Sequence, residues 1–273
     1  MNDSIDIRRA AAPSEYRALQ VAQRKAWGIV DDEYIVPLAT MVGAQLHGGL
    51  VLGAFLPDGS AVGLSFAFLG RIEGRVGLYS QLTGVVPGFQ DKGIGSRLKK
   101  LQREIARVEG CELIAWSFDP LQAGNARFNL GKLGASSSRY VEDMYGPRND
   151  ALNRNTPTDR LIAVWPTDPE TRPWSTSSLD LEPMRIIQVR VDSNGESIPF
   201  DLLSCADAES IAIEIPRNIN EMRSVDPIRA SAWQSHVRTA FRTAFASGFR
   251  AVGFSDCVED GIERSFYLLV RGG

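Results

Sequence analysis

The residues best suited to chemistry lie in one short segment, Gln90-Asp91-Lys92-Gly93-Ile94-Gly95. It separates a strand-like run that ends at Val85-Val86-Pro87 from an amphipathic helix that starts near Ser96. A glycine-containing turn from a strand into a helix directs backbone N–H groups at one point, and the positive end of the helix dipole lies at the same point. The sequence therefore predicts a turn that binds a pyrophosphate.

Two familiar phosphate loops do not fit this segment. A Walker loop needs a lysine directly after its second glycine, whereas Lys92 precedes Gly93. A Rossmann fingerprint needs a third glycine, and Leu98 occupies that position. The strand is also preceded by antiparallel-looking hairpins. The pyrophosphate is therefore expected to belong to another kind of cofactor.

The pattern that does fit is Gln/Arg-x-x-Gly-x-Gly after a strand that ends in Val-x-Pro. It resembles the acyl-CoA-binding motif of the GNAT superfamily of N-acetyltransferases. Downstream, a helix that starts at Asn125 and runs into Lys132-Leu133-Gly134 is similar to the second motif of that superfamily. The resemblance covers roughly residues 5–165. Three further segments resemble a long bacterial branch of the superfamily: Trp116–Pro120, Leu152–Arg154 and Pro157–Arg160.

This resemblance implies an acyl-CoA site around the turn. Backbone groups of the preceding strand would pair with the pantetheine arm and polarise the thioester carbonyl, and the amides from Asp91 to Ser96 would bind the pyrophosphate. Gln90 holds a position usually taken by Arg or Gln, and Asp91 stands where glycine is common. The alternative interpretation of Gly93 and Gly95 is a tight turn that binds no ligand. The alternative interpretation of Asn125 is a helix cap. The implied cofactor-binding residues are Gly84, Val85, Val86, Gln90, Asp91, Lys92, Gly93, Ile94, Gly95, Ser96 and Asn125.

Two residues are candidates for catalysis. Asp119 follows a buried type of strand, residues 112–118, at the carboxyl edge where α/β sites gather, and is a candidate base or anchor for the acceptor amine. The alternative is a turn residue before Pro120. Tyr79 lies on the strand before the turn and is a candidate for the acceptor pocket, with packing as its alternative. The superfamily often places a tyrosine acid where this chain has Leu130, which cannot donate a proton.

Two polar segments each allow both a functional and a structural interpretation. The long stretch from Asp143 to Arg160 either covers the acceptor site or forms a network of structural ion pairs. The helix after the turn has an apolar stripe through Leu98, Leu101, Ile105 and Val108. Its basic residues Lys99, Lys100 and Arg103 are expected on a solvated face or at the 3′-phosphate of CoA.

The expected fold class is α/β (α+β), with a mixed, mostly antiparallel sheet and flanking helices. Helices near 14–26 and 37–44 precede a meander of strands at 50–55, 61–69 and 76–86, and a crossover helix leads to a parallel strand at 112–118. The predicted domains are an acyl-CoA-binding domain at 1–165, a Pro/Ser/Thr-rich linker at 166–183, and a C-terminal β-β-α-β-β region at 184–273. Because Ile213–Pro216 is followed by a helix and a strand, this region is a candidate degenerate half-repeat without the glycine pair.

Bulk composition limits the classes of partner. The 273 residues are 44% hydrophobic and 23% charged, with a formal net charge of −3, so no basic footprint favours nucleic acid or an anionic membrane. Three separated cysteines predict reduced thiols and a cytoplasmic location. Two histidines without a second ligand at metal spacing argue against a metal site.

These features predict a cytoplasmic enzyme that transfers an acetyl or other acyl group from CoA to an amine of a small molecule or peptide. The alternative is an acyl-CoA-binding protein with little or no turnover, acting as a sensor or assembly partner. Nucleotide binding through the same turn is a third hypothesis. A homodimer is compatible with the C-terminal strands.

Overall fold

A computed structural model describes residues 5–146, 157–171, 182–192 and 196–272. The chain forms two compact units: unit 1 comprises Met1–Trp116 with Pro166–Thr171, and unit 2 comprises Ser117–Trp165 with Arg172–Gly273. The division falls inside a strand, between Trp116 and Ser117, and not at the predicted limits of 165 and 184. That residues 1–165 and 184–273 fold as separate domains stays a prediction. Residues 172–181 of the predicted linker lie outside the described residues.

Unit 1 is a mixed sheet with flanking helices, as predicted. Strands β1 to β5 follow one another across the sheet, and every neighbouring pair is antiparallel except the parallel pair β4–β5. The elements are β1 (Asp6–Arg9), α1 (Pro13–Trp27), a 3₁₀ turn (Asp32–Tyr34), α2 (Leu38–Leu46), β2 (Leu50–Phe55), β3 (Ala61–Ile72), β4 (Arg75–Val85), α3 (Ile94–Val108) and β5 (Leu113–Phe118).

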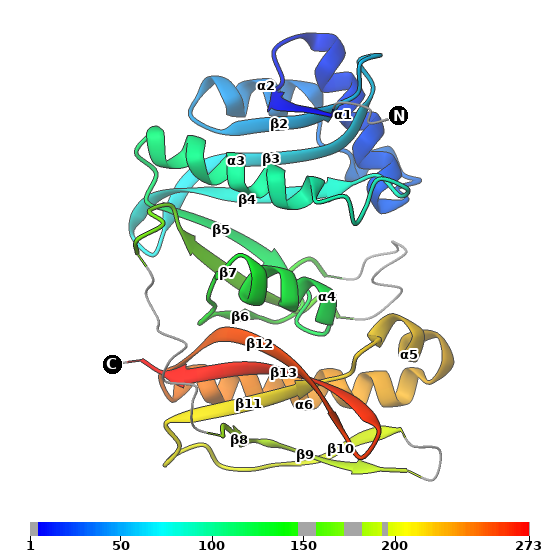
Figure 1. Cartoon of the computed structure of the whole chain (residues 1–273), viewed down its shortest axis with the longest axis vertical. Helices are drawn as coiled ribbons and strands as arrows, with labels where there is room; N and C mark the ends of the chain where they lie inside the picture. Colours follow the sequence, from blue (N-terminus) through cyan, green and yellow to red (C-terminus); the bar gives the residue numbers. More distant parts are fainter. Residues whose placement is uncertain (1–4, 147–156, 172–181, 193–195, 273) are drawn as a thin grey trace. The chain divides into compact units, whose positions relative to one another are not determined.

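The two faces of this sheet carry different interiors. Helices α1 and α2 pack on one face through an apolar cluster that includes Leu19, Met41 and Phe66. Helix α3 lies across β3 and β4 on the other face (Figure 1). There Gly63 allows a close approach, since a Cβ at this position would lie 3.1 Å from Ile94 Cγ2. Successive strand residues point to opposite faces, so the two interiors are built from alternate positions of the same strands.

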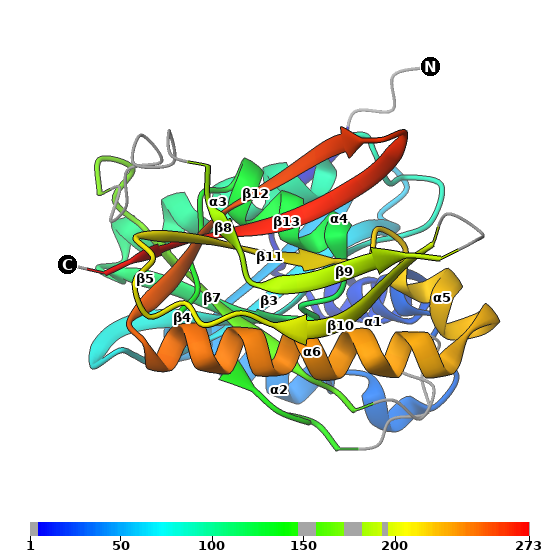
Figure 2. The same ribbon diagram turned by 90° about the horizontal axis from the view of Figure 1, so that it is seen from below.

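Unit 2 contains a four-stranded sheet in the order β12-β13-β11-β8 and a separate two-stranded ribbon, β10-β9. The long helix α6 runs along β10 (Figure 2), where Trp233 Nε1 donates to the Ser197 carbonyl oxygen at 3.3 Å. The elements are α4 (Ala123–Ala126), a π-helical turn (Arg127–Lys132), β6 (Tyr140–Val141), β7 (Arg160–Pro166), β8 (Met184–Arg185), β9 (Ile187–Val191), β10 (Ser197–Leu202), β11 (Ser210–Ile215), α5 (Ile219–Val225), α6 (Pro227–Ala246), β12 (Phe249–Glu259) and β13 (Ile262–Arg271).

The C-terminal region is richer than the predicted β-β-α-β-β order. Strand β10 and helix α5 are additional, and the first strand of the predicted order is divided into β8 and β9. The sequence signal of β10 is weak because Pro199 interrupts it, Phe200 is half exposed, and the pairing with β9 shifts register between Pro199 and Asp201.

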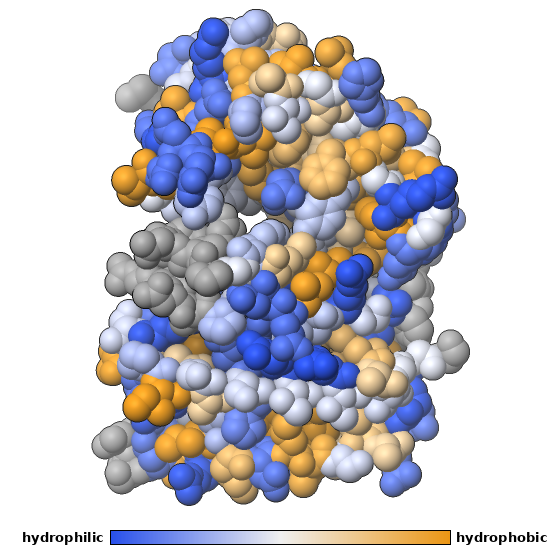
Figure 3. Space-filling model, turned by 180° about the vertical axis from the view of Figure 1, so that it is seen from behind, coloured by the Kyte–Doolittle hydropathy of each residue, from blue (hydrophilic) through white to orange (hydrophobic). Residues whose placement is uncertain are grey.

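The surface in Figure 3 is mixed in hydropathy, and the described helices are too short or too polar to cross a membrane. On the face shown in Figure 3, hydrophobic side chains lie among hydrophilic ones. Within the described residues, no helix has the combined length and hydrophobicity required to cross a bilayer.

Candidate functional site

Strand β4 separates from its parallel neighbour part-way along its length. The β4–β5 register pairs Gly77, Leu78 and Tyr79 with Leu113, Ile114 and Ala115. From Ser80 onward β4 continues to Val85 with β3 as its partner. The register with β3 also shifts here, because Phe66 pairs with Leu82 and the next residue, Ala67, pairs with Ser80. Gln81 is therefore the extra residue of a β-bulge, and β4 has an open edge beyond it.

Val85 lies on that open edge. The Val86 N–H donates to the Val62 carbonyl oxygen at 2.9 Å, so the backbone groups of Val86 point toward β3. In an antiparallel pair the backbone groups of alternate residues point to the same side. Gly84 therefore also faces β3, whereas Thr83 and Val85 face the open edge. The residues predicted to pair with a pantetheine arm are Gly84, Val85 and Val86. The backbone groups of Val85 point toward the open edge, whereas Gly84 faces β3 and the Val86 N–H already donates to Val62.

The turn after β4 contains several left-handed residues. The φ values are +86° at Gly88, +60° at Asp91 and +75° at Gly93. Gln90 Nε2 donates to the Val85 carbonyl oxygen at 3.3 Å, which connects the turn to the open edge. Asp91 is exposed and occupies a conformation that favours glycine, which fits its place in a motif where glycine is common.

Gly93 caps helix α3 without a side chain. It is the N-cap residue, its carbonyl accepts from the Arg97 N–H at 3.0 Å, and no acidic residue lies in the first helical turn. The first N–H groups of a helix have no acceptor inside the helix. A Cβ at Gly93 would meet nothing within 4 Å, and one at Gly95 would lie 3.8 Å from Val85 Cγ2. The backbone of this turn is thus open to a ligand.

Gly84 has a packing role. A Cβ at this position would lie 2.3 Å from Trp27 Cη2, at the end of helix α1. Only glycine lets β4 lie against this indole ring.

A buried polar network underlies the open edge. Lys99 is 3% exposed, and its Nζ donates to Ser80 Oγ at 2.8 Å and to Gln102 Oε1 at 3.1 Å. Its charge lies 4.0 Å from the centroid of the Trp116 ring. Burial lowers the pKa of Lys99 from 10.5 to about 7. The prediction of a solvated or phosphate-facing Lys99 is therefore wrong.

The predicted stripe of α3 is also corrected. The buried residues are Ile94, Leu98, Lys99, Gln102 and Ala106, whereas Val108 is 77% exposed. The face is rotated because hydroxyls of β3 and β4 lie beneath the helix and accept polar partners. Arg103 donates from Nε to the Pro166 carbonyl oxygen at 2.9 Å, so it binds backbone within unit 1.

The two catalytic candidates lie in different units. Tyr79 on β4 is half-buried, and its ring centroid lies 5.4 Å from that of Phe68. In unit 2, Asp119 Oδ1 accepts from the Leu121 N–H at 2.9 Å, and Oδ2 accepts from Arg223 Nη1 at 3.2 Å. Both carboxylate oxygens of Asp119 thus have partners inside unit 2. These contacts favour the alternative interpretation, in which Asp119 is a structural turn residue before Pro120 and not a catalytic base.

The second motif forms an irregular helix in unit 2. Asn125 is exposed and is the third residue of α4, whose N-cap is Gln122, so the alternative of Asn125 as a cap is wrong. The chain then continues as the π-helical turn Arg127–Lys132. Leu130, at the position of the expected acid, is 2% exposed. π-Helical turns occur frequently at functional sites.

Most of the polar stretch from Asp143 to Arg160 that the structure describes is occupied by internal bonds of unit 2. Asp159 is 2% exposed and accepts from Tyr140 Oη at 2.7 Å, the Asp143 N–H at 3.0 Å, and both Nε and Nη2 of Arg238 on α6. For the described residues of this stretch, these bonds favour a structural ion-pair network over a cover for the acceptor site. Leu152–Arg154 lies outside the described residues.

One hydroxyl pair was missed at the sequence level. Tyr145 Oη lies 2.8 Å from Ser117 Oγ at the end of β5, and the Arg160 guanidinium lies 5.4 Å from the tyrosine ring centroid. No local pattern joins Ser117 to Tyr145, which are 28 residues apart, so only the fold could reveal this contact.

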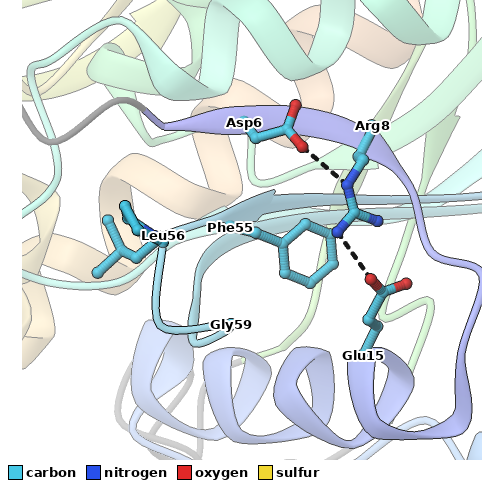
Figure 4. A pocket seen from close by; sticks show the side chains of 7 residues that line it. Asp6, Arg8, Glu15, Phe55, Leu56 and Gly59 are labelled. Atoms are coloured by element: carbon cyan, nitrogen blue, oxygen red, sulfur yellow. Dashed lines mark hydrogen bonds and ion pairs between the residues drawn. The ribbon is translucent and has the colours of Figure 1, made fainter.

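Two cavities lie away from the turn. One, of about 330 Å³, is on unit 1 beside β1 and the β2–β3 turn (Figure 4). There Arg8 is held between Asp6 and Glu15, over the Phe55 ring. Glu15 also accepts from the Ala11 and Ala12 N–H groups, so its role is to cap α1. The second, of about 170 Å³ in unit 2, is lined by paired charges such as Arg127–Asp256 and Arg217–Glu263.

Within the part of the chain that the structure describes, no three His, Cys, Asp or Glu side chains gather in a way that could hold a metal ion. The expectation that the protein uses no metal stays a prediction.

No protein-family model matches the chain, and no curated protein is significantly similar to it. Solved structures similar to part of it include a GNAT superfamily phosphinothricin acetyltransferase from Sinorhizobium meliloti in complex with AcCoA, at 15% identity and a TM-score of 0.48 over 60% of this chain and 88% of that one. Another is the ribosomal-protein-S18-alanine N-acetyltransferase from Escherichia coli, at 14% identity and 0.46 over 63% of this chain and 99% of that one. Similarity at this level does not establish a shared activity or site.

Proposed function

We propose that the chain is an acyltransferase of the GNAT type, which moves an acetyl or other acyl group from CoA to an amine of a small molecule or peptide. The observation that carries the proposal is the junction between β4 and α3 in unit 1. There an open strand edge leads directly into a helix N-terminus that is capped by glycine alone. A nucleotide carried on a long amide-bearing arm would use both features at once.

The open edge suits the pantetheine arm. The arm is an extended chain with two amide groups, and an exposed strand edge binds extended amides by main-chain hydrogen bonds. Thr83 and Val85 offer backbone groups on this edge, and the bulge at Gln81 ends the pairing that would otherwise fill it. These contacts favour CoA over ATP or NAD, which have no such arm.

The glycine-capped turn suits the pyrophosphate. The open N–H groups and the dipole of α3, a helix of 15 residues, attract an anion. Left-handed Gly88 and Gly93 bring the backbone forward without side chains in the way. Lys92 is exposed in the same turn and adds a positive charge. The proposed cofactor-binding residues are those from Gln90 to Ser96, together with Val85.

Bound acyl-CoA would supply an activated carbonyl and a thiolate leaving group. The neutral amine of the acceptor attacks the carbonyl carbon, the carbon–sulfur bond breaks, and one proton passes from nitrogen to sulfur. The N–H groups of the open edge stabilise the negative charge on the carbonyl oxygen. Holding both reactants together lowers the barrier further, by up to about 7–11 kcal/mol in favourable cases.

A second candidate function is acyl-CoA binding with little or no turnover. Leu130 is buried at the position of the expected acid, and Asp119 is engaged by Arg223 and the Leu121 N–H. Neither observation removes the binding turn, so a sensor or assembly protein would keep the same affinity for CoA.

Calorimetry with CoA, acetyl-CoA, ATP and NAD tests the binding part of the proposal. We expect CoA and acetyl-CoA to bind and the other two to bind weakly or not at all. Equal affinity for all four would show a general nucleotide site and contradict the role of the strand edge.

Release of free thiol from acetyl-CoA, measured with a broad pool of small amines and peptides, separates the two candidates. Acceptor-dependent release supports the enzyme. Tight binding without release across the whole pool supports the binding protein.

A further inference from the structure

Lys99 has an environment that packing alone does not explain. Its side chain is 3% exposed and lies between α3 and the sheet of unit 1. Its described partners are neutral: Ser80, Gln102 and the ring of Trp116. An ammonium group buried without a counterion is costly, and an apolar residue of similar length would fill the same space at lower cost.

The hydrogen-bond network that includes Lys99 joins helix α3 to two strands, β3 and β4, beneath the bulge. Gln102 Nε2 donates to Ser65 Oγ on β3 at 3.0 Å, and Ser65 Oγ lies 2.9 Å from Thr83 Oγ1. Ser80 Oγ, which accepts from Lys99, lies 3.4 Å from the same Thr83 hydroxyl. Lys99 therefore closes a ring of hydrogen bonds through both ends of the segment from Ser80 to Thr83.

This ring depends on the bulge. In a regular strand Ser80 and Thr83, three positions apart, would point to opposite faces. The extra residue Gln81 puts both hydroxyls on the face beneath α3, within reach of each other. The same segment is where β4 leaves β5, since the last β4–β5 pair is Tyr79 with Ala115. The bulge, the opening of the edge and the lysine thus coincide.

We propose that Lys99 is a positioning residue for acyl transfer: through Ser80 and Thr83 its Nζ fixes the bulge that opens β4 and aims the open-edge amides at the thioester carbonyl. The inference rests on the proposed function, since it assigns the residue that shapes the same site. Lys99 itself does not touch the acyl group. It acts through the backbone of Thr83, which faces the open edge.

The test uses the full chain with Lys99→Met, which keeps the length of the side chain and removes the charge and the donors. Arg107→Met is the matched control, because Arg107 is an exposed basic residue of the same helix. Three properties are measured: the affinity for CoA by calorimetry, the carbonyl ¹³C shift of bound [1-¹³C]acetyl-CoA, and the rate of thiol release between pH 6 and 9.

We expect Lys99→Met still to bind CoA, because the turn from Gln90 to Ser96 is intact, with only the contribution of the strand edge to the affinity reduced. We expect the carbonyl resonance to lose the shift that the wild type induces, and thiol release to fall by roughly 10²- to 10³-fold, the effect of losing one oxyanion donor. The inflection near pH 7 in the pH profile of release should disappear as well, which leaves the dependence set by the acceptor amine. Arg107→Met should match the wild type in all three measurements.

The outcomes are distinguishable. If wild-type protein does not bind CoA, the proposed function falls, and this inference with it. If it binds CoA but Lys99→Met keeps the wild-type carbonyl shift, the inference is overturned and the proposed function stands. Should Lys99→Met fail to fold, Ser80→Ala and Thr83→Val break the same ring with neutral substitutions, and unchanged carbonyl shifts in both would overturn the inference.

Discussion

The chain contains two strand–helix units that look alike in sequence and differ in construction. In unit 1, β4 leads through Pro87 to α3, which is capped by Gly93. In unit 2, β11 leads through Pro216 to α5, where Asn218 Oδ1 accepts from the Glu221 N–H at 3.2 Å. The first helix start has no side-chain cap, and the second satisfies one N–H group with its own side chain.

The helices that follow also bury different chemistry. Helix α3 buries Lys99 and Gln102 against hydroxyls, whereas α6 buries Trp233, Val237 and Phe241, each 0% exposed. The strands differ too, since β4 and β5 are parallel neighbours and β13 lies between β11 and β12. A strand–helix order therefore does not predict a cofactor site by itself. Under the proposed function, the helix cap and the residues beneath the helix distinguish unit 1, the binding unit, from unit 2, the packing unit.

The polar interior of α3 should produce the largest effect on stability. Because burial lowers the pKa of Lys99 to about 7, the unfolded chain binds one more proton than the folded chain between pH 7 and 10.5. The free energy of unfolding of the wild type, relative to that of Lys99→Met, should rise across this window by up to roughly 5 kcal/mol. Below pH 7 both states are protonated, so no further slope arises from this group.

Denaturant titrations of both proteins at several pH values measure this difference. Groups that face Lys99 from the neighbouring elements are Gln102 on α3, Ser65 on β3, Ser80 on β4 and Trp116 on β5, and none of them titrates in this window. A constant difference between the two proteins from pH 7 to 10 would contradict a buried, readily deprotonated lysine.

The packing unit, unit 2, should depend strongly on its buried carboxylate Asp159, which is 2% exposed. Asp159→Ala leaves Arg238 and Tyr140 without their acceptor and should lower the free energy of unfolding by roughly 3 kcal/mol. CoA affinity should be unchanged at temperatures where the variant is folded. Glu142, which also pairs with Arg238 but is 39% exposed, gives the matched control, and Glu142→Ala should cost less than about 1 kcal/mol. Similar losses in both variants would contradict the distinction.

The binding turn should respond to substitution at its cap. Gly93→Val places a β-branched residue at φ +75° and puts methyl groups beside the open N–H groups. We expect CoA affinity to fall by at least about tenfold, or 1.4 kcal/mol. Gly110→Val is the control, since Gly110 has φ +77° with nothing within 4 Å and lies after α3. If both variants kept wild-type affinity, the pyrophosphate would not bind at this turn.

The sequence predicts only the local features that distinguish the strand–helix unit of unit 1 from that of unit 2. The segment from Gln90 to Gly95 predicts the turn, since glycine at fixed spacing after a strand has few other uses, and the meander around it follows from alternation and turn residues. Asn218 could have been recognised as a cap, because Asn followed three residues later by Glu is a helix-start pattern.

Other features depend on contacts that no local pattern encodes. Lys99 looks like a surface residue until Ser65, Ser80 and Thr83 are brought beneath the helix, and the bulge at Gln81 that aligns two of them has no sequence signature here. Asp119 is a catalytic candidate by its place after a strand, and its contact with Arg223, 104 residues away, favours a structural role that no local pattern predicts. Such long-range partners require the fold.

A smaller effect should follow from removing strain in the binding turn. Asp91 is exposed at φ +60°, where glycine avoids a cost of about 1 kcal/mol. Asp91→Gly should therefore raise the free energy of unfolding by up to that amount and tighten CoA binding, because it also removes a negative charge near the phosphates. Asp260→Gly, at φ +51° in unit 2, should give similar stabilisation without a change in affinity. Weaker CoA binding by Asp91→Gly would show that the carboxylate itself contacts the ligand.

The smallest effect comes from giving the packing unit the cap of the binding unit. Asn218→Gly removes the side-chain acceptor and should cost only a few tenths of a kcal/mol, because water can reach the freed N–H groups. It should not create CoA binding, since Glu221 remains in the first turn of α5 and Glu263 remains paired with Arg217 beside it. These carboxylates repel a phosphate. Calorimetry with CoA on Asn218→Gly, in a background that carries Gly93→Val, measures this directly. Restored affinity would mean that a bare helix start is sufficient, and that the open edge of β4 contributes little.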